Sequence, residues 1–233
     1  MWWKIDEVAD DILIQERKLL KRILGVKQGT SNDLIYIELG RCDIISRIKD
    51  LQFKFNEKIN KATFQEAILA HAYAKCKDLQ IISYYTNLRS DNKITNKTNR
   101  INSLNISNST TCIRYRQLCN PDKINPILYD SYNNDKYRTI ITRWRLSNFD
   151  LHIEKGRYNQ TPRELRLCNS CQQGRIEDEH HVIFDCSLYK DIREKYREYL
   201  LKNNSVKLIL DPISEEDFCS AAKLLIDIES IRM

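Results

Sequence analysis

The stretch from Cys168 to Cys186 constrains this chain more than any other, because it gathers three cysteines and two histidines. Cys168 and Cys171 form a C-x-x-C pair, whose spacing lets one tight turn direct two thiolates at a single ion. Cys186 offers a third sulfur, and either His180 or His181 offers a nitrogen. The pattern therefore predicts a zinc site that is built into the fold.

Four protein ligands would complete the tetrahedral shell of zinc and leave no position for water or substrate. The predicted site is therefore structural and not hydrolytic. The acidic run 177–179 is interpreted as favourable charge at a helix N-terminus, and not as a general base. Gly174 lies where such a turn often requires a positive φ. Two alternatives are a redox-active cysteine pair, which no strand–helix setting before Cys168 supports, and core thiols that hold no metal.

Spacing alone does not choose between the two histidines. If the segment after His181 is α-helical, Cys186 follows five residues later and projects about 140° away from it. From His180 the offset is six residues, or about 120° in the other direction. A helix that ends before Cys186 would relax both constraints, so either histidine can be the fourth ligand.

Apolar residues recur at helical spacing along the chain, and only 5 of its 233 residues are glycine and 4 are proline. This composition favours helices over a turn-rich sandwich. We expect a mostly α fold, in which helical segments accompany a small CCHC zinc knuckle near the C-terminal third. One helix is expected over residues 6–24 with Gly25 as its stop, and another over residues 135–146. Residues 151–153 are expected to be extended.

The chain divides by composition into three regions. Residues 1–86 are predicted to be helical. Residues 87–134 are rich in asparagine, which competes with regular backbone hydrogen bonding, and are interpreted as a partly disordered linker or a weak helix. Residues 135–233 are predicted to carry a basic helix, the CCHC zinc-binding domain and C-terminal helices.

The net charge of +6 is unevenly placed. Residues 87–166 hold 15 Lys and Arg against 7 Asp and Glu, whereas the remainder is slightly acidic. This asymmetry predicts a surface for a polyanion such as RNA or DNA, and the alternative is a solvated segment that is basic by chance. No apolar run reaches the length of a membrane span, and no secretory h-region is visible. We therefore expect an intracellular chain, cytoplasmic or nuclear, with no membrane partner.

Arginines that precede the zinc site are the candidate nucleic-acid contacts, because Lys and Arg supply most phosphate contacts. They are Arg138, Arg143, Arg145, Arg157, Arg163 and Arg166. Tyr137, Trp144 and Tyr158 are interleaved with them, and their rings could stack on unpaired bases. The alternative places Tyr137 and Trp144 in the core and the arginines on a solvated face.

Several of these motifs together resemble the C-terminal region of reverse transcriptases from LINE-type (non-LTR) retrotransposons. The family shows an IE-x-GR segment, arginines, a C-x-x-C pair, IEDE-x-H and a last cysteine before x-x-Tyr, in this order. The matching segments here are 151–158, 162–168, 176–181 and 186–189, with Arg193 after them. Segments 24–30 and 37–41 resemble the part of the family that follows the polymerase thumb.

The resemblance implies that His181 is the metal ligand, because His180 fills the variable position of IEDE-x-H. The expected ligands are then Cys168, Cys171, His181 and Cys186. It also implies that the region assists in engaging template RNA or target DNA. The polymerase signature ending in Asp-Asp is absent, since Asp10-Asp11 follows Ala9 in a helical pattern.

We therefore expect a C-terminal piece without catalysis of its own, whose parent would be an RNA-directed DNA polymerase. Two alternatives remain for its function. One is a zinc-scaffolded protein-interaction module, in which the helices around residues 188–200 and 218–228 offer a groove to a partner. The other is an inactive remnant of a retroelement.

Overall fold

The computed structural model describes residues 5–62, 71, 75, 92–122, 124–126, 134–171 and 173–232. The α-helices in this part are α1 (Ile5–Ile23), α2 (Asn32–Glu38), α3 (Ile44–Ala62), α6 (Asn92–Ile106), α7 (Thr110–Leu118), α8 (Asp135–Arg145), α9 (His152–Tyr158), α10 (Lys190–Lys195), α11 (Arg197–Lys202), α12 (Val206–Leu210) and α13 (Glu215–Arg232). Three short turns are η3 (Arg163–Leu165), η4 (His181–Asp185) and η5 (Ser187–Tyr189).

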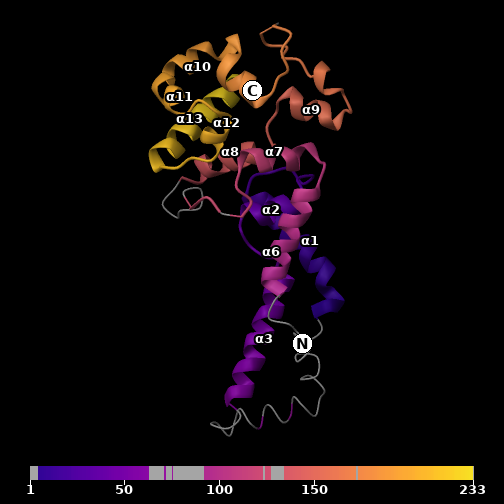
Figure 1. The fold of residues 1–233 in the computed structure, drawn as a ribbon. Coiled ribbons are helices and arrows are strands. Elements are labelled where there is room, and N and C mark those ends of the chain that lie inside the picture. The colour runs from indigo at the N-terminus through magenta and orange to yellow at the C-terminus, as the bar shows by residue number, and fades with distance from the viewer. Residues whose placement is uncertain are drawn as a thin grey trace.

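The prediction of a mostly α fold with a Cys–His cluster in the C-terminal third is confirmed. Within the described residues the structure has no strand, only an isolated antiparallel bridge between Leu167 and Ile176. Helices α9 to α13 gather at one end of the molecule, and α3 extends toward the other (Figure 1). None of the helices in the described part is long and apolar enough to cross a membrane.

The first hydrophobic core forms where α1, α2, α6 and α7 meet. Helix α2 is only seven residues long, but it is buried along almost its whole length from Leu34 to Glu38. The Tyr36 hydroxyl donates to the Glu16 carboxylate of α1 at 2.7 Å, which satisfies a polar group inside this core. Helix α1 ends before Gly25, whose φ of 65° confirms the predicted stop.

The second hydrophobic core lies in the C-terminal part, where α13 packs along α8. Trp144 of α8 is fully buried against Phe149, and its indole N–H donates to Glu229 of α13 at 3.0 Å. The interpretation of Trp144 as a core residue is therefore the correct one. Cys168 and Cys186 belong to this same core, so the cysteine cluster is anchored on the packed C-terminal helices.

The two cores are joined by a buried ion pair. Arg145, at the end of α8, donates to the two oxygens of Glu38 in α2 at 2.6 and 3.1 Å, and both side chains are almost fully buried. The same guanidinium donates to the Leu210 carbonyl and to Asp211, beyond α12. Burial disfavours the Arg145 charge, but Glu38 more than offsets this and raises the pKa of Arg145.

Part of the Asn-rich region is helical in the structure. Helices α6 and α7 lie within it, and Leu104, Cys112 and Tyr115 are buried in the first core. The division into three domains stays a prediction, because most of residues 63–91 lie outside the described part. The extended segment expected at residues 151–153 is wrong: α9 begins at His152, with Leu151 as its N-cap residue.

Candidate metal centre

A short hairpin presents the C-x-x-C pair. The bridge between Leu167 and Ile176 closes its base, and the Cys168 amide donates to the Arg175 carbonyl at 2.8 Å. Gly174 adopts a φ of 64° before the chain returns, as the sequence predicted. This conformation is costly for residues with a Cβ, which explains a glycine at this position. The hairpin holds Cys168 buried and leaves Cys171 partly exposed.

A π-helical turn, η4, presents the other two ligands. The Cys186 amide donates to the His181 carbonyl at 2.7 Å, which closes an i to i+5 bond. The wider π turn brings Cys186 back to the same side as His181, whereas an α-helix would separate them by about 140°. The Asp178 carboxylate accepts from the His181 amide at 3.0 Å and fixes the start of this turn.

The four ligand atoms converge on one point. Cys168 Sγ and Cys186 Sγ lie 3.8 Å apart, and Cys171 Sγ lies 3.3 Å from His181 Nε2. All four atoms lie within 4.8 Å of one another. Zn–S and Zn–N bonds of about 2.3 and 2.0 Å give tetrahedral edges of about 3.8 Å between two sulfurs and about 3.5 Å between sulfur and nitrogen. The cluster can therefore hold a metal ion such as zinc.

The pKa shifts of Cys171, His181 and Cys186 are consistent with their use as metal ligands. Burial and the neighbouring Cys168 raise the pKa of Cys186. Burial acts against the Cys171 thiolate too, but hydrogen bonds from the Gln173 backbone and the other two cysteines lower its pKa. Burial lowers the pKa of His181, which keeps the imidazole neutral as a metal ligand requires. Cysteines bind metal as thiolates, and a divalent cation in the cluster would stabilise that charge.

The two histidines occupy different environments. His181 is buried, with only 3 % of its surface exposed, whereas the His180 side chain is 63 % exposed. His180 lies 3.4 Å from the Asp185 carboxylate, and its ring lies beside Phe184. The structure thus brings His181, and not His180, into the cysteine cluster.

The acidic residues before the histidines connect residues 168–186, here called the metal segment, to the rest of the fold. Glu177 is buried, and its carboxylate accepts from Arg232 at the end of α13 at 2.6 Å and from the His152 amide at 2.7 Å. Glu179 pairs with Arg114 of α7. The sequence reasoning missed Arg114 and Arg232, because no local spacing links α7 or α13 to this loop. These contacts go beyond the helix-terminus charge that was expected.

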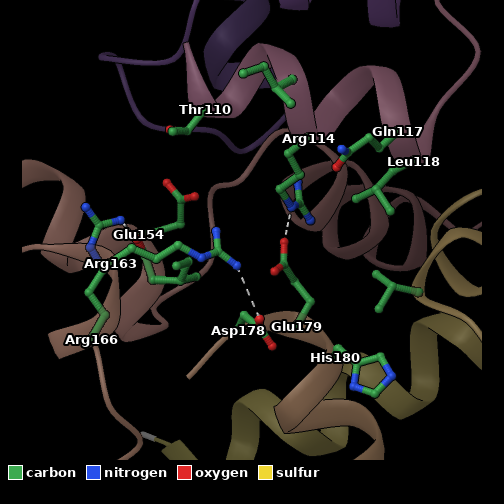
Figure 2. Close-up of a pocket in the computed structure, with 13 residues that line it drawn as sticks. Thr110, Arg114, Gln117, Leu118, Glu154, Arg163, Arg166, Asp178, Glu179 and His180 are labelled. Carbon is green, nitrogen blue, oxygen red and sulfur yellow. Dashed lines mark hydrogen bonds and ion pairs between the residues drawn. The ribbon is translucent and has the colours of Figure 1, made fainter. Parts of the chain in front are cut away.

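Asp178 and Glu179 also line a cavity of about 480 Å³ between α7 and the metal segment. Figure 2 shows Arg163 directed at Asp178 and Arg114 directed at Glu179 across this cavity. Arg163 Nη2 lies 3.6 Å from the Asp178 carboxylate, and the Arg163 side chain is 64 % exposed. Arg114 is held more firmly, because it also donates to the carbonyls of Trp144 and Arg145 at the end of α8.

The six predicted nucleic-acid contacts separate into two groups. Three of them hold the fold: Arg145 is buried in its ion pair, Arg143 pairs with Glu229, and Arg166 donates to the carbonyls of Ile153 and Thr161. Arg145 cannot reach a phosphate, because its guanidinium is enclosed and paired, and it is removed from the set. Gly156 makes room for Arg166, whose side chain occupies the position that a Cβ would take.

Of the other three arginines, Arg163 is the most exposed, at 64 %, whereas Arg157 and Arg138 are only 28 % and 26 % exposed. Arg163 lies in η3, directly before the hairpin. Arg157 at the end of α9 pairs with Glu154 at 2.7 Å and lies under the exposed ring of Tyr158. Arg138 pairs with Asp135 within α8, which is a surface contact. The structure therefore brings Arg163 beside the metal segment, where it faces Asp178, and places Arg157 on α9 and Arg138 on α8.

Comparison with known proteins gives no further assignment. No protein-family model, no curated protein and no solved structure matches the chain.

Proposed function

We propose that this chain is a zinc-stabilised nucleic-acid-binding segment, the C-terminal part of a LINE-type reverse transcriptase, which helps to engage template RNA or target DNA and carries no catalysis of its own. The observation that carries the proposal is the closed Cys₃His cluster, with its four ligand atoms within 4.8 Å. Such a shell offers no open coordination position, so the metal would serve to fix the surrounding chain.

The segment that the cluster fixes carries accessible cations. Arg163 stands directly before the hairpin, Arg175 is 59 % exposed within it, and Lys155 is 47 % exposed on α9. Each of these pairs with a carboxylate, but exposed ion pairs contribute little energy and are readily exchanged for phosphate contacts. A fixed loop also loses less conformational entropy on binding than a free one.

The proposal is tested by titrating the full, zinc-loaded chain into a fluorescein-labelled single-stranded RNA and following the anisotropy at several salt concentrations. The logarithm of the affinity is expected to fall linearly with the logarithm of salt, by about 0.7 per phosphate neutralised. The Arg163→Gln and Arg175→Gln double variant should weaken binding and reduce this slope.

Arg197→Gln is the matched control, because Arg197 of α11 is 68 % exposed and pairs with the exposed Glu194 of α10. It should bind as the wild type does. An affinity that does not change between about 50 and 200 mM salt would refute the electrostatic proposal. A protein partner that remains bound after nuclease treatment would favour the protein-interaction alternative.

A further inference from the structure

Arg232, in the last turn of α13, contacts three segments that surround the cysteine cluster. Its Nη1 donates to the Glu177 carboxylate at 2.6 Å and to the Tyr189 hydroxyl at 3.0 Å. Its Nη2 donates to the Asp150 carbonyl at 2.7 Å and to the second Glu177 oxygen at 3.3 Å. Asp150 precedes α9, Glu177 lies in the metal segment, and Tyr189 ends η5, the turn that follows Cys186. The end of α13 is thus fastened around the metal segment.

Glu177 carries this contact to the metal ligands. The residue is only 1 % exposed, and its Oε1 lies 3.9 Å from Cys168 Sγ. Its Oε2 accepts from the His152 amide at 2.7 Å, which fixes the carboxylate beside the first sulfur of the C-x-x-C pair. Arg232 is a permanent cation next to this carboxylate, whereas the His152 ring, 3.6 Å away, is charged only when protonated.

Metal binding would place a negative charge beside Glu177. Cysteines bind zinc as thiolates, so three thiolates against the two positive charges of the ion leave one net negative charge. A metal-free cluster of protonated thiols and a neutral imidazole carries none. The buried carboxylate near Cys168 opposes this change, because like charges repel more strongly where water is excluded. An arginine paired with the carboxylate cancels that repulsion and favours the metal-bound state.

The contact also gives the metal centre a connection to the packing of the C-terminal part. Helix α13 packs along α8, and its apolar residues belong to the second hydrophobic core. The Arg232 side chain is only 16 % exposed, so it is held in its position at the end of this helix. A coupling free energy acts in both directions. If docked Arg232 strengthens metal binding, the bound metal must also hold the last turn of α13 more firmly.

We propose that Arg232 is a positioning residue of the metal centre, which neutralises Glu177 beside Cys168 and thereby couples the docking of the last turn of α13 to metal affinity. The proposal rests on the zinc-stabilised segment proposed above, and it is independent of the nucleic acid that this segment binds. The metal centre is thereby linked to the second hydrophobic core through a residue that is not a ligand.

The test measures the zinc affinity of the full chain by competition with a chelator of known affinity. Arg232→Gln should lower the affinity about tenfold, because residues behind the metal ligands commonly tune it by this amount. Arg232→Lys, which keeps the positive charge, should lose less. Glu177→Gln combined with Arg232→Gln should regain most of the lost affinity, because it removes the unpaired buried charge. A purely structural role of Arg232 predicts no such recovery.

Arg143→Gln is the matched control. Arg143 also holds α13, since it pairs with Glu229 at 3.2 Å, but it does so from α8 and not from the metal segment. Its side chain is 32 % exposed. Arg143→Gln should leave the zinc affinity unchanged. A loss equal to that of Arg232→Gln would show that any loosening of α13 weakens the site, and it would refute the specific role of Arg232.

Hydrogen–deuterium exchange gives a second readout, which follows the coupling in the opposite direction. Zinc should slow exchange in residues 226–232 of the wild type and of Arg143→Gln, because the coupling is reciprocal. This protection should be lost in Arg232→Gln. Equal protection of this turn in Arg232→Gln and in the wild type would refute the coupling.

The remaining outcomes separate this proposal from the general function. If the wild type binds zinc and Arg232→Gln binds it equally tightly, the role of Arg232 is refuted and the metal centre stands. If the affinity falls but the double variant does not recover, the neutralisation of Glu177 is refuted. If the wild type binds no zinc, the metal centre and this proposal are both refuted. Recovery in the double variant, with zinc-dependent protection of residues 226–232, supports the proposal even for a chain that binds no RNA.

Discussion

Replacement of Arg145 by methionine should destabilise the whole fold without acting on nucleic-acid binding directly. The substitution keeps an apolar chain of similar length but removes the donors to Glu38, to the Leu210 carbonyl and to Asp211. Glu38, which is 2 % exposed, would keep the hydrogen bond from the Tyr115 hydroxyl but lose the buried cation that balances its charge. Breaking a buried ion pair on one side costs about 3–5 kcal/mol.

The assay is urea unfolding of the zinc-loaded chain followed by far-ultraviolet circular dichroism. With a slope of about 2 kcal/mol per M, the midpoint should fall by about 2 M. Glu38→Gln should cost less, because Arg145 keeps Asp211, which lies 3.0 Å away. The double variant Glu38→Met with Arg145→Met should cost less than the sum of the two single changes, because it leaves no isolated buried charge.

The reasoning is refuted if Arg145→Met costs less than about 1 kcal/mol, the range of an exposed pair. An Arg145→Met chain that keeps its stability but loses affinity and salt dependence, as expected of the Arg163→Gln and Arg175→Gln double variant, would place Arg145 among the phosphate contacts. In that case the two cores would be held together by apolar packing and not by this ion pair.

Three further predictions concern the metal segment and the loop of residues 27–30, which Asn148 holds in place. Native mass spectrometry should find one zinc in wild type and His180→Ala but none in His181→Ala, and loss of metal from both variants would contradict the ligand assignment. Cys171→Ser, or a chelator, should expose residues 168–186 to limited proteolysis, because metal binding and folding are coupled; unchanged cleavage would show that the segment is stable without metal. Asn148→Ala should lower the free energy of unfolding by about 1–3 kcal/mol, because the Lys27 amide and the buried Thr30 hydroxyl lose their hydrogen bonds to the Asn148 side chain. An unchanged midpoint in urea unfolding would contradict this prediction.

The sequence by itself determined the helical class and three of the four metal ligands. Helical periodicity is a local property, and the expected stop at Gly25 and helix over 135–146 agree with α1 and α8. The C-x-x-C spacing is equally local, because a short hairpin is enough to bring Cys168 and Cys171 together. The expected extended segment at residues 151–153 failed, since the local pattern did not reveal that α9 begins at His152.

The tertiary structure decided what local spacing left open. The π turn places His181 beside the sulfurs and His180 at the surface, which no α-helical offset distinguishes. Arg145 and Arg163 look equivalent in the sequence, yet one is buried against Glu38 and the other is exposed. The Asn148 side chain accepts a hydrogen bond from the Lys27 amide, although the two residues are 121 positions apart in the sequence. Such contacts depend on how helices pack, and packing depends on the whole chain at once.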